Sequence, residues 1–174
     1  MDKEYKKLMK AELARYDMSL RAFLLGYHSY QVGRYIKSMR IVQYCARHRN
    51  LYYLILRGIN QIVMRRVANR IGFQFNPQKI GWGITIFHLG SIVINHKAII
   101  GDNVCLYPGV CIGRTADDRV PTIGNNVTFF TNSAAYGGVH IGNNVTIAPN
   151  AVVTHDVPDD CVVAGVPAKV IKFK

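Results

Sequence analysis

His88 is the residue of this sequence whose type and position best suit catalysis. It lies between the strings IGWGITIF and LGSIVIN, where a six-residue apolar repeat slips by two positions. Imidazole changes its charge near neutral pH, so a ring exposed at such a slip can act as a general base that takes a proton from an alcohol. The alternative is a histidine that only caps one turn of the repeat.

The spacing of the other histidines and of the cysteines does not suit a metal site. His96 is the nearest histidine to His88, eight residues along the chain, and the four cysteines contain no CxxC pair. Structural zinc sites usually draw their ligands from closer pairs, so we expect no metal. We interpret the other histidines as structural or solvated, and the cysteines as reduced and structural.

An apolar residue returns every six positions from residue 80 onward. The strings IGDNV, IGNNV and IGNNV place glycine and asparagine or aspartate between two aliphatic residues. Glycine and asparagine tolerate the left-handed backbone of a tight corner, and β-branched residues favour the extended segments beside it. The pattern therefore predicts a β-solenoid. Its repeat positions are Ile80, Ile86, Ile94, Ile100, Leu106 and Ile112, then Ile123, Phe129, Ala135, Ile141, Ile147 and Val153.

Two segments depart from the repeat. Residues 115–122 (TADDRVPT) carry three charges and a proline, so we expect them to leave the coil as a loop, where sites are often built. Residues 1–72 instead show apolar residues at helical spacing, for example at Leu20, Phe23, Leu24 and Tyr27. We predict a small α-helical domain over residues 1–72 and a mainly β domain over residues 73–174.

The positive charge is concentrated in the first domain. Residues 1–72 hold 15 Lys and Arg against 4 Asp and Glu, a balance of +11, and the remainder holds 7 against 6, a balance of +1. The cations are dispersed without a nucleic-acid-binding motif, so we expect no nucleic acid. Apolar residues and cations interleave over residues 51–67, which suits peripheral contact with an anionic membrane. Packing of this apolar stripe within the protein or on a neighbouring subunit is the alternative.

No segment has the features of a membrane span or a secretion signal. The longest apolar stretch, residues 51–64, is interrupted by Arg57 and Asn60, and the N-terminus is charged where a signal peptide is apolar. We expect a cytoplasmic protein, with any membrane contact made at the inner face.

Three strings narrow the interpretation further. GYHSYQVGRY from Gly26, KIGWGITIFHLGSIVIN around His88 and the late segment AVVTHDVPDDCVVAGVPAKVI resemble the serine-acetyltransferase-like branch of the hexapeptide-repeat acyltransferases. The resemblance implies a left-handed parallel β-helix preceded by the helical domain, and a homotrimer. It also implies that coenzyme A lies in the groove between neighbouring solenoids.

The resemblance assigns the chemistry as well. It implies direct transfer from acetyl-CoA to a hydroxyl group in a ternary complex, with His88 as the general base and no metal. The amides of Gly113 and Arg114 become candidates for stabilising the oxyanion. The expected coenzyme A edge consists of Gly113, Arg114, Thr131, Pro149 and Lys169.

Three positions depart from the serine enzymes of that branch. The string GFQFNPQKIG lacks their acidic residue, Phe87 replaces the aspartate before the histidine, and Val120 replaces a histidine in DRVP. We therefore expect the acceptor to be a sugar hydroxyl of a surface-polysaccharide precursor, with serine as the alternative and a non-enzymatic trimeric scaffold as a third hypothesis. We expect the second ring nitrogen of His88 to pair with Asp117, Asp118 or a backbone carbonyl.

Overall fold

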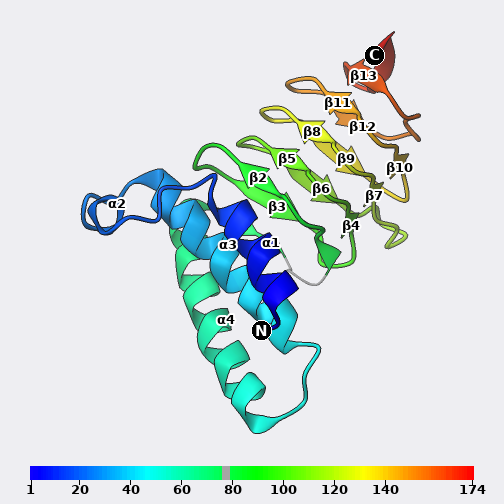
Figure 1. Cartoon of the computed structure of the whole chain (residues 1–174). Coiled ribbons are helices and arrows are strands. Elements are labelled where there is room, and N and C mark those ends of the chain that lie inside the picture. The colour runs from blue at the N-terminus through cyan, green and yellow to red at the C-terminus, as the bar shows by residue number, and fades with distance from the viewer. Residues whose placement is uncertain (76–78) are drawn as a thin grey trace. The chain divides into compact units, whose positions relative to one another are not determined.

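The computed structural model describes residues 1–75 and 79–174, which form two compact units, Met1–Gly72 and Phe73–Lys174 (Figure 1). The intervening residues 76–78 belong to the string GFQFNPQKIG and lie outside the described residues. The first unit is helical, and the second is a parallel β-solenoid. The solenoid expected from the six-residue repeat is thereby confirmed.

Four helices make the first unit. They are α1 (Lys3–Leu13), α2 (Leu20–Leu24), α3 (His28–Cys45) and α4 (Leu51–Ile71). Both ends of α4 have a local cause: the Asn50 side chain accepts a hydrogen bond from the Tyr53 amide (3.0 Å) at its start, and Gly72 ends it with a left-handed φ of 81°. The buried residues of α3, among them Val32 and Met39, form the centre of this unit.

A buried ion pair joins α1 to α3. Nε and Nη2 of Arg40 donate to the two carboxylate oxygens of Glu12 at 2.7 and 2.6 Å, and both side chains are 1% exposed. Gln43 accepts a third hydrogen bond from this guanidinium at 2.7 Å. Removing one partner of such a pair leaves a buried charge uncompensated and costs about 3–5 kcal/mol. The pair therefore fixes α1 at one position on α3.

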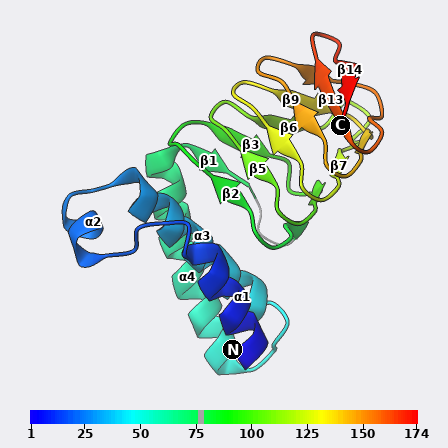
Figure 2. The ribbon, with the colours of Figure 1, turned by 45° about the horizontal axis from the view of Figure 1, so that its top comes forward.

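The strands of the second unit form three faces of a prism (Figure 2). The five-strand face holds β1 (Phe73–Gln74), β3 (Ile92–Ile94), β6 (Cys111–Gly113), β9 (Ala134–Tyr136) and β12 (Val152–Val153). The three-strand face holds β4 (Ile99–Ile100), β7 (Thr122–Ile123) and β10 (His140–Ile141). The six-strand face holds β2 (Thr85–Ile86), β5 (Cys105–Leu106), β8 (Thr128–Phe129), β11 (Thr146–Ile147), β13 (Cys161–Ala164) and β14 (Lys169–Phe173).

Successive coils stack in register. Ile86 pairs with Leu106, Leu106 with Phe129 and Phe129 with Ile147, and all four side chains are at most 1% exposed. All pairs between neighbouring coils are parallel, and the last strand, β14, turns back antiparallel against β13. The repeat residues thus fill the inside of the prism, and three corners remain where the chain passes from one face to the next.

The asparagine corner, between the three-strand and six-strand faces, is held by two side-chain ladders. Asn103, Asn126 and Asn144 have φ of 55° to 57°, and their side-chain amides bond from coil to coil at 3.2 and 3.0 Å. The preceding Asp or Asn of each coil accepts from the backbone of the coil before it, as Asn143 does from the Asn125 amide at 2.9 Å. The IGDNV and IGNNV strings therefore encode a structural corner.

Asn126 tests what this corner contributes to stability. Asn126→Ala should lower the free energy of unfolding by about 1–3 kcal/mol, because alanine is disfavoured at positive φ and two ladder hydrogen bonds are lost. Asn126→Gly loses the same hydrogen bonds without the backbone cost, so it should destabilise less. Urea unfolding of both variants measures the difference, and equal losses would show that the left-handed backbone is not the cause.

Candidate functional site

His88 lies on an enlarged corner between the six-strand and five-strand faces, which we call the histidine corner. From Ile86 to Ile92 the chain advances six residues, whereas the equivalent passage in the next coil, from Leu106 to Val110, takes four. The two additional residues are the slip seen in the sequence. His88 is exposed on this corner.

The enlarged corner folds closely onto the next coil. Gly90 has a φ of 149°, and a Cβ there would lie 2.8 Å from the Cβ of Pro108. A larger residue would push the corner away from the solenoid. Gly90 thereby holds the segment that carries His88 against its neighbour.

An aromatic column stands beside His88. The rings of Phe87 and Tyr107 lie 5.3 Å apart, and those of Tyr107 and Phe130 are stacked at 4.8 Å. These residues directly follow β2, β5 and β8, so they occupy the same place in successive coils, and Phe87 is 48% exposed. The sequence indicates Phe87 only as a missing aspartate, and it does not single out Tyr107 or Phe130. Their equal position after the repeat residues was the available signal.

Three of the expected coenzyme A residues share the edge of the solenoid that begins at His88. Thr131 and Pro149 follow the aromatic position in the next coils and are exposed. Lys169 pairs with Ala164 at the end of β13, beside the segment whose Ala168 amide donates to the Val152 carbonyl at 2.8 Å. Four coil steps of about 4.8 Å separate His88 from this end, a rise of about 19 Å. We call this line of residues the histidine edge.

The other two expected residues lie at a different corner. Gly113 ends β6 and pairs with Tyr136, whose ring covers it, since a Cβ on Gly113 would meet that ring at 2.6 Å. Arg114 follows and donates to Asp118 at 2.8 Å. Both belong to the passage between the five-strand and three-strand faces, which we call the loop corner. Within one chain the structure does not bring them to the histidine edge.

The segment expected to leave the coil does so between β6 and β7. Thr122, which we had included in it, already belongs to β7 and pairs with Ile99 and His140. The turn is closed by a hydrogen bond from the Thr115 amide to the Arg119 carbonyl at 3.2 Å. The loop proper therefore spans residues 114–121.

The two loop aspartates have local partners. Asp118 pairs with Lys97 and Arg114, and the hydrogen bond from Lys97 is the main reason that its pKa is lowered. Hydrogen bonds to Asp117 from the Thr115 hydroxyl and then from Arg119 lower its pKa to about 2. Both carboxylates are engaged at the loop corner, and within one chain neither is shown to orient His88.

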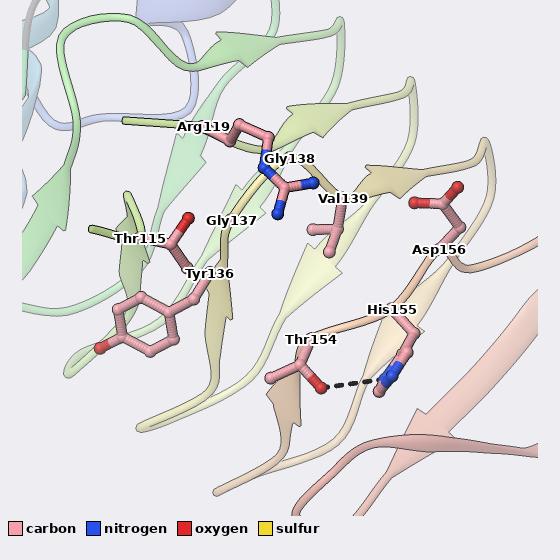
Figure 3. A pocket seen from close by; sticks show the side chains of 9 residues that line it. All are labelled: Thr115, Arg119, Tyr136, Gly137, Gly138, Val139, Thr154, His155 and Asp156. Atoms are coloured by element: carbon pink, nitrogen blue, oxygen red, sulfur yellow. Dashed lines mark hydrogen bonds between the residues drawn. The ribbon is translucent and has the colours of Figure 1, made fainter. Parts of the chain in front are cut away.

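A pocket of about 460 Å³ opens at the loop corner (Figure 3). Arg119 lies across Gly138 at the rim of the pocket, and a Cβ on Gly138 would lie 3.2 Å from the Cβ of Arg119. The Thr154 hydroxyl and Nδ1 of His155 are hydrogen-bonded at 3.0 Å. Its lining comes from three coils. The lining residues are Thr115, Arg119, Tyr136, Gly137, Gly138, Val139, Thr154, His155 and Asp156.

The described residues offer no cluster of metal ligands, and one tyrosine at the loop corner has a shifted pKa. Within residues 1–75 and 79–174, no three His, Cys, Asp or Glu side chains gather as a metal would require. A hydrogen bond with Cys111, followed by burial, raises the pKa of Tyr136. The chemistry available at the histidine corner is therefore that of an exposed imidazole beside aromatic rings.

The chain resembles known proteins over both units. A family model described as Bacterial transferase hexapeptide (six repeats) matches residues 121–155. A serine acetyltransferase of Synechococcus elongatus is 40% identical over 104 residues, 58% of this chain and 43% of that protein. One of Helicobacter pylori is 35% identical over 130 residues, 72% of this chain and 74% of that protein. A serine acetyltransferase solved in complex with CoA has a TM-score of 0.64 and 25% identity, covering 81% of this chain and 57% of that chain.

The ion pairs of the loop predict its response to acid. The pKa values of Asp117 and Asp118 are lower in the folded chain than the unfolded value of 3.8. Their contribution to the stability of the fold is therefore complete above pH 3.8, and it is lost as the pH falls through their folded pKa values. The backbone amide signals of residues 115–119 should stay constant from pH 8 to about 4.5 and shift below it. An NMR titration measures this, with Asp118→Asn as the variant whose loop signals should already be shifted at pH 7.

Proposed function

Because the chain belongs to the serine acetyltransferase family of hexapeptide-repeat proteins, we propose that it transfers the acetyl group of acetyl-CoA to a hydroxyl group, with His88 as the general base. The observation that carries the proposal is the enlarged histidine corner, which exposes an imidazole at the foot of a straight edge of the solenoid. The chain spans less than half of one curated relative and about three quarters of another.

The proposed reaction is a single transfer in a ternary complex. The neutral imidazole of His88 accepts the hydroxyl proton while the hydroxyl oxygen bonds to the thioester carbonyl carbon, which gives a tetrahedral oxyanion. The oxyanion collapses, the carbon–sulfur bond breaks, and the departing thiolate takes the proton from the imidazolium. Products are the acetyl ester and coenzyme A, and the histidine returns to its neutral form. Holding both substrates beside one base removes most of the entropic cost of their encounter.

The histidine edge is the proposed path of coenzyme A. Its upper part offers a small residue, Thr131, and the ring of Pro149, both exposed and stacked in successive coils. Lys169 at the far end can meet a phosphate of the nucleotide. A similar serine acetyltransferase has been solved in complex with CoA, which supports CoA as the donor.

A homotrimer would complete the site. The amides of Gly113 and Arg114 lie at the loop corner, so they can serve the oxyanion at His88 only if they come from a neighbouring chain. The seam between adjacent solenoids, which the family resemblance implies, would unite the histidine edge of one chain with the loop corner of the next. We also propose a cytoplasmic location, where acetyl-CoA is available.

L-Serine is the first acceptor to consider. The curated relatives are serine acetyltransferases, and this favours serine over the sugar hydroxyl that we had placed first from the sequence. The sugar remains the second candidate because of one observation, the aromatic surface of Phe87 and Tyr107 beside His88. Residues 87–91, 107–110, 130–133 and 148–151, which build this corner, include no acidic residue that could pair with the ammonium group of serine.

His88→Ala tests the general base. Loss of such a base usually slows turnover by a factor of about 10² to 10⁴, so we expect at least a hundredfold lower kcat in a thiol-release assay with acetyl-CoA. The circular dichroism spectrum and the oligomeric mass should not change, because His88 is exposed. His140→Ala, which alters an exposed histidine on β10 of the three-strand face, is the matched control and should keep nearly full turnover. Turnover of His88→Ala equal to that of the control would remove His88 from the mechanism.

Phe87 tests the choice of acceptor. Phe87→Asp introduces a carboxylate next to His88, and a hydrogen bond between charged groups of about 1.5–3 kcal/mol should raise kcat/KM for L-serine by about tenfold or more. Phe87→Asn has the same size without the charge, so it should not show this gain. The same variants assayed on nucleotide-sugars and oligosaccharides should lose activity if the aromatic surface binds a sugar ring. Unchanged serine kinetics in both variants would place the acceptor away from Phe87.

A further inference from the structure

Helix α4 exposes a continuous row of large aliphatic side chains. Leu51, Ile55, Ile59 and Ile62 are 70, 55, 55 and 54% exposed. At 3.6 residues per turn they lie within about 80° of one another around the helix axis, and they extend over three turns. Single exposed aliphatic residues are ordinary, but a contiguous row of them marks an interaction surface. We call this row the α4 stripe.

The α4 stripe is not needed for the core of its own unit. The buried residues of α4 are Met64, Val67 and Ile71, and α3 packs along α4 (Figure 1). The helical spacing in the sequence therefore identified a helix correctly, but its most regular apolar face points to solvent. Another surface must cover it or meet it.

Cations stand at both ends of the stripe. Arg49 precedes it, and Arg65, Arg66 and Arg70 follow it, and all four are exposed. The guanidinium of Arg47 instead lies over the Tyr5 ring of α1, 5.9 Å from its centroid. The sequence contains no Asp or Glu from residue 18 to residue 101. The surface that the stripe meets must accept apolar side chains in its middle and positive charge at both ends.

Arg57 does not belong to this set. It lies within the segment 51–67 whose interleaved cations suggest membrane contact, but it is only partly exposed. Burial raises the pKa of the Cys45 thiol at the end of α3, and the charges of the N-terminus and then of Arg57 oppose this rise. The exposed face of α4 is therefore apolar from Leu51 to Ile62 without a cation on it.

The α4 stripe of a second copy fits this face poorly. In an antiparallel pair centred on residues 51–62, residue 51 faces residue 62, so the end of α4 with Arg65 and Arg66 lies beside the start of the other α4, which Arg49 precedes. In a parallel pair each arginine faces itself. Both arrangements bring cations together with no acidic residue of this region between them, and like charges at contact are unfavourable.

We propose that the α4 stripe binds the surface of an anionic lipid membrane, with its axis in the plane of the surface. The aliphatic side chains enter the boundary between headgroups and acyl chains, and the arginines at both ends meet lipid phosphates. The structure has no helix, among the residues that it describes, that is long and apolar enough to cross a bilayer. The inference stands independently of the proposed acetyl transfer.

Co-sedimentation of the full chain with vesicles tests the charges. The chain should bind vesicles of phosphatidylglycerol and phosphatidylcholine at low salt, bind far less at 0.5 M salt, and not bind pure phosphatidylcholine. Arg65→Gln with Arg66→Gln should weaken partition about thirty-fold, the equivalent of about 1 kcal/mol per cation. Lys6→Gln with Lys7→Gln removes the same net charge from exposed positions of α1 and should weaken partition much less. Equal loss in the two double variants would overturn a specific contact through α4.

The apolar part has its own variant. Ile55→Ser with Ile59→Ser should weaken vesicle binding at least tenfold. The acetyltransferase kinetics and the melting temperature should stay unchanged, because both side chains are more than half exposed. Sedimentation velocity of the same variant should give the same mass as the unaltered chain. A smaller mass, together with absence of vesicle binding by the unaltered chain, would overturn the proposal and show that the stripe is covered by a second copy.

Discussion

The in-register stacking of coils is the constraint on which the site depends. In each coil the repeat residues point into the interior of the prism. Parallel strand pairs place four of them directly above one another: Ile86, Leu106, Phe129 and Ile147. Any residue at a fixed place in the coil therefore stands in a column with its equivalents, about 4.8 Å apart. The asparagine corner keeps this register through its side-chain ladders. The histidine corner and the loop corner can therefore vary in sequence and hold the proposed site.

This constraint explains how far the sequence could predict the site. The six-residue period is local, so the solenoid, its core and the enlarged corner at His88 follow from it directly. The period alone does not tell which corner a residue occupies after an insertion. Gly113 and Thr131 are eighteen residues apart, as equivalent positions in adjacent coils would be, but the loop shifts the count to twenty-three, as the pairing of Leu106 with Phe129 shows. The equivalent of Thr131 is therefore Pro108, and Gly113 lies at another corner.

The helical unit shows a different limit. Apolar spacing predicts an amphipathic helix, and α4 is one, but spacing does not tell whether the apolar face meets the core. Here the core contact uses Met64, Val67 and Ile71 near the end of the helix, and the more regular row before them stays exposed. The tertiary contact with α3 decides this, and that contact depends on residues far away in the sequence. Family membership supports the proposed acetyl transfer, whereas the acceptor does not follow from it, because Phe87 stands where the family resemblance leads one to expect an aspartate.

The crystal structure of the chain with bound CoA tests the central claim most directly, because it shows which edge of the solenoid carries the donor. The account predicts that the thiol lies beside His88 and that the pantetheine arm passes Thr131 and Pro149 toward Lys169. CoA bound along the asparagine corner, or confined to the pocket at the loop corner with its thiol away from every His88 of the assembly, would contradict it.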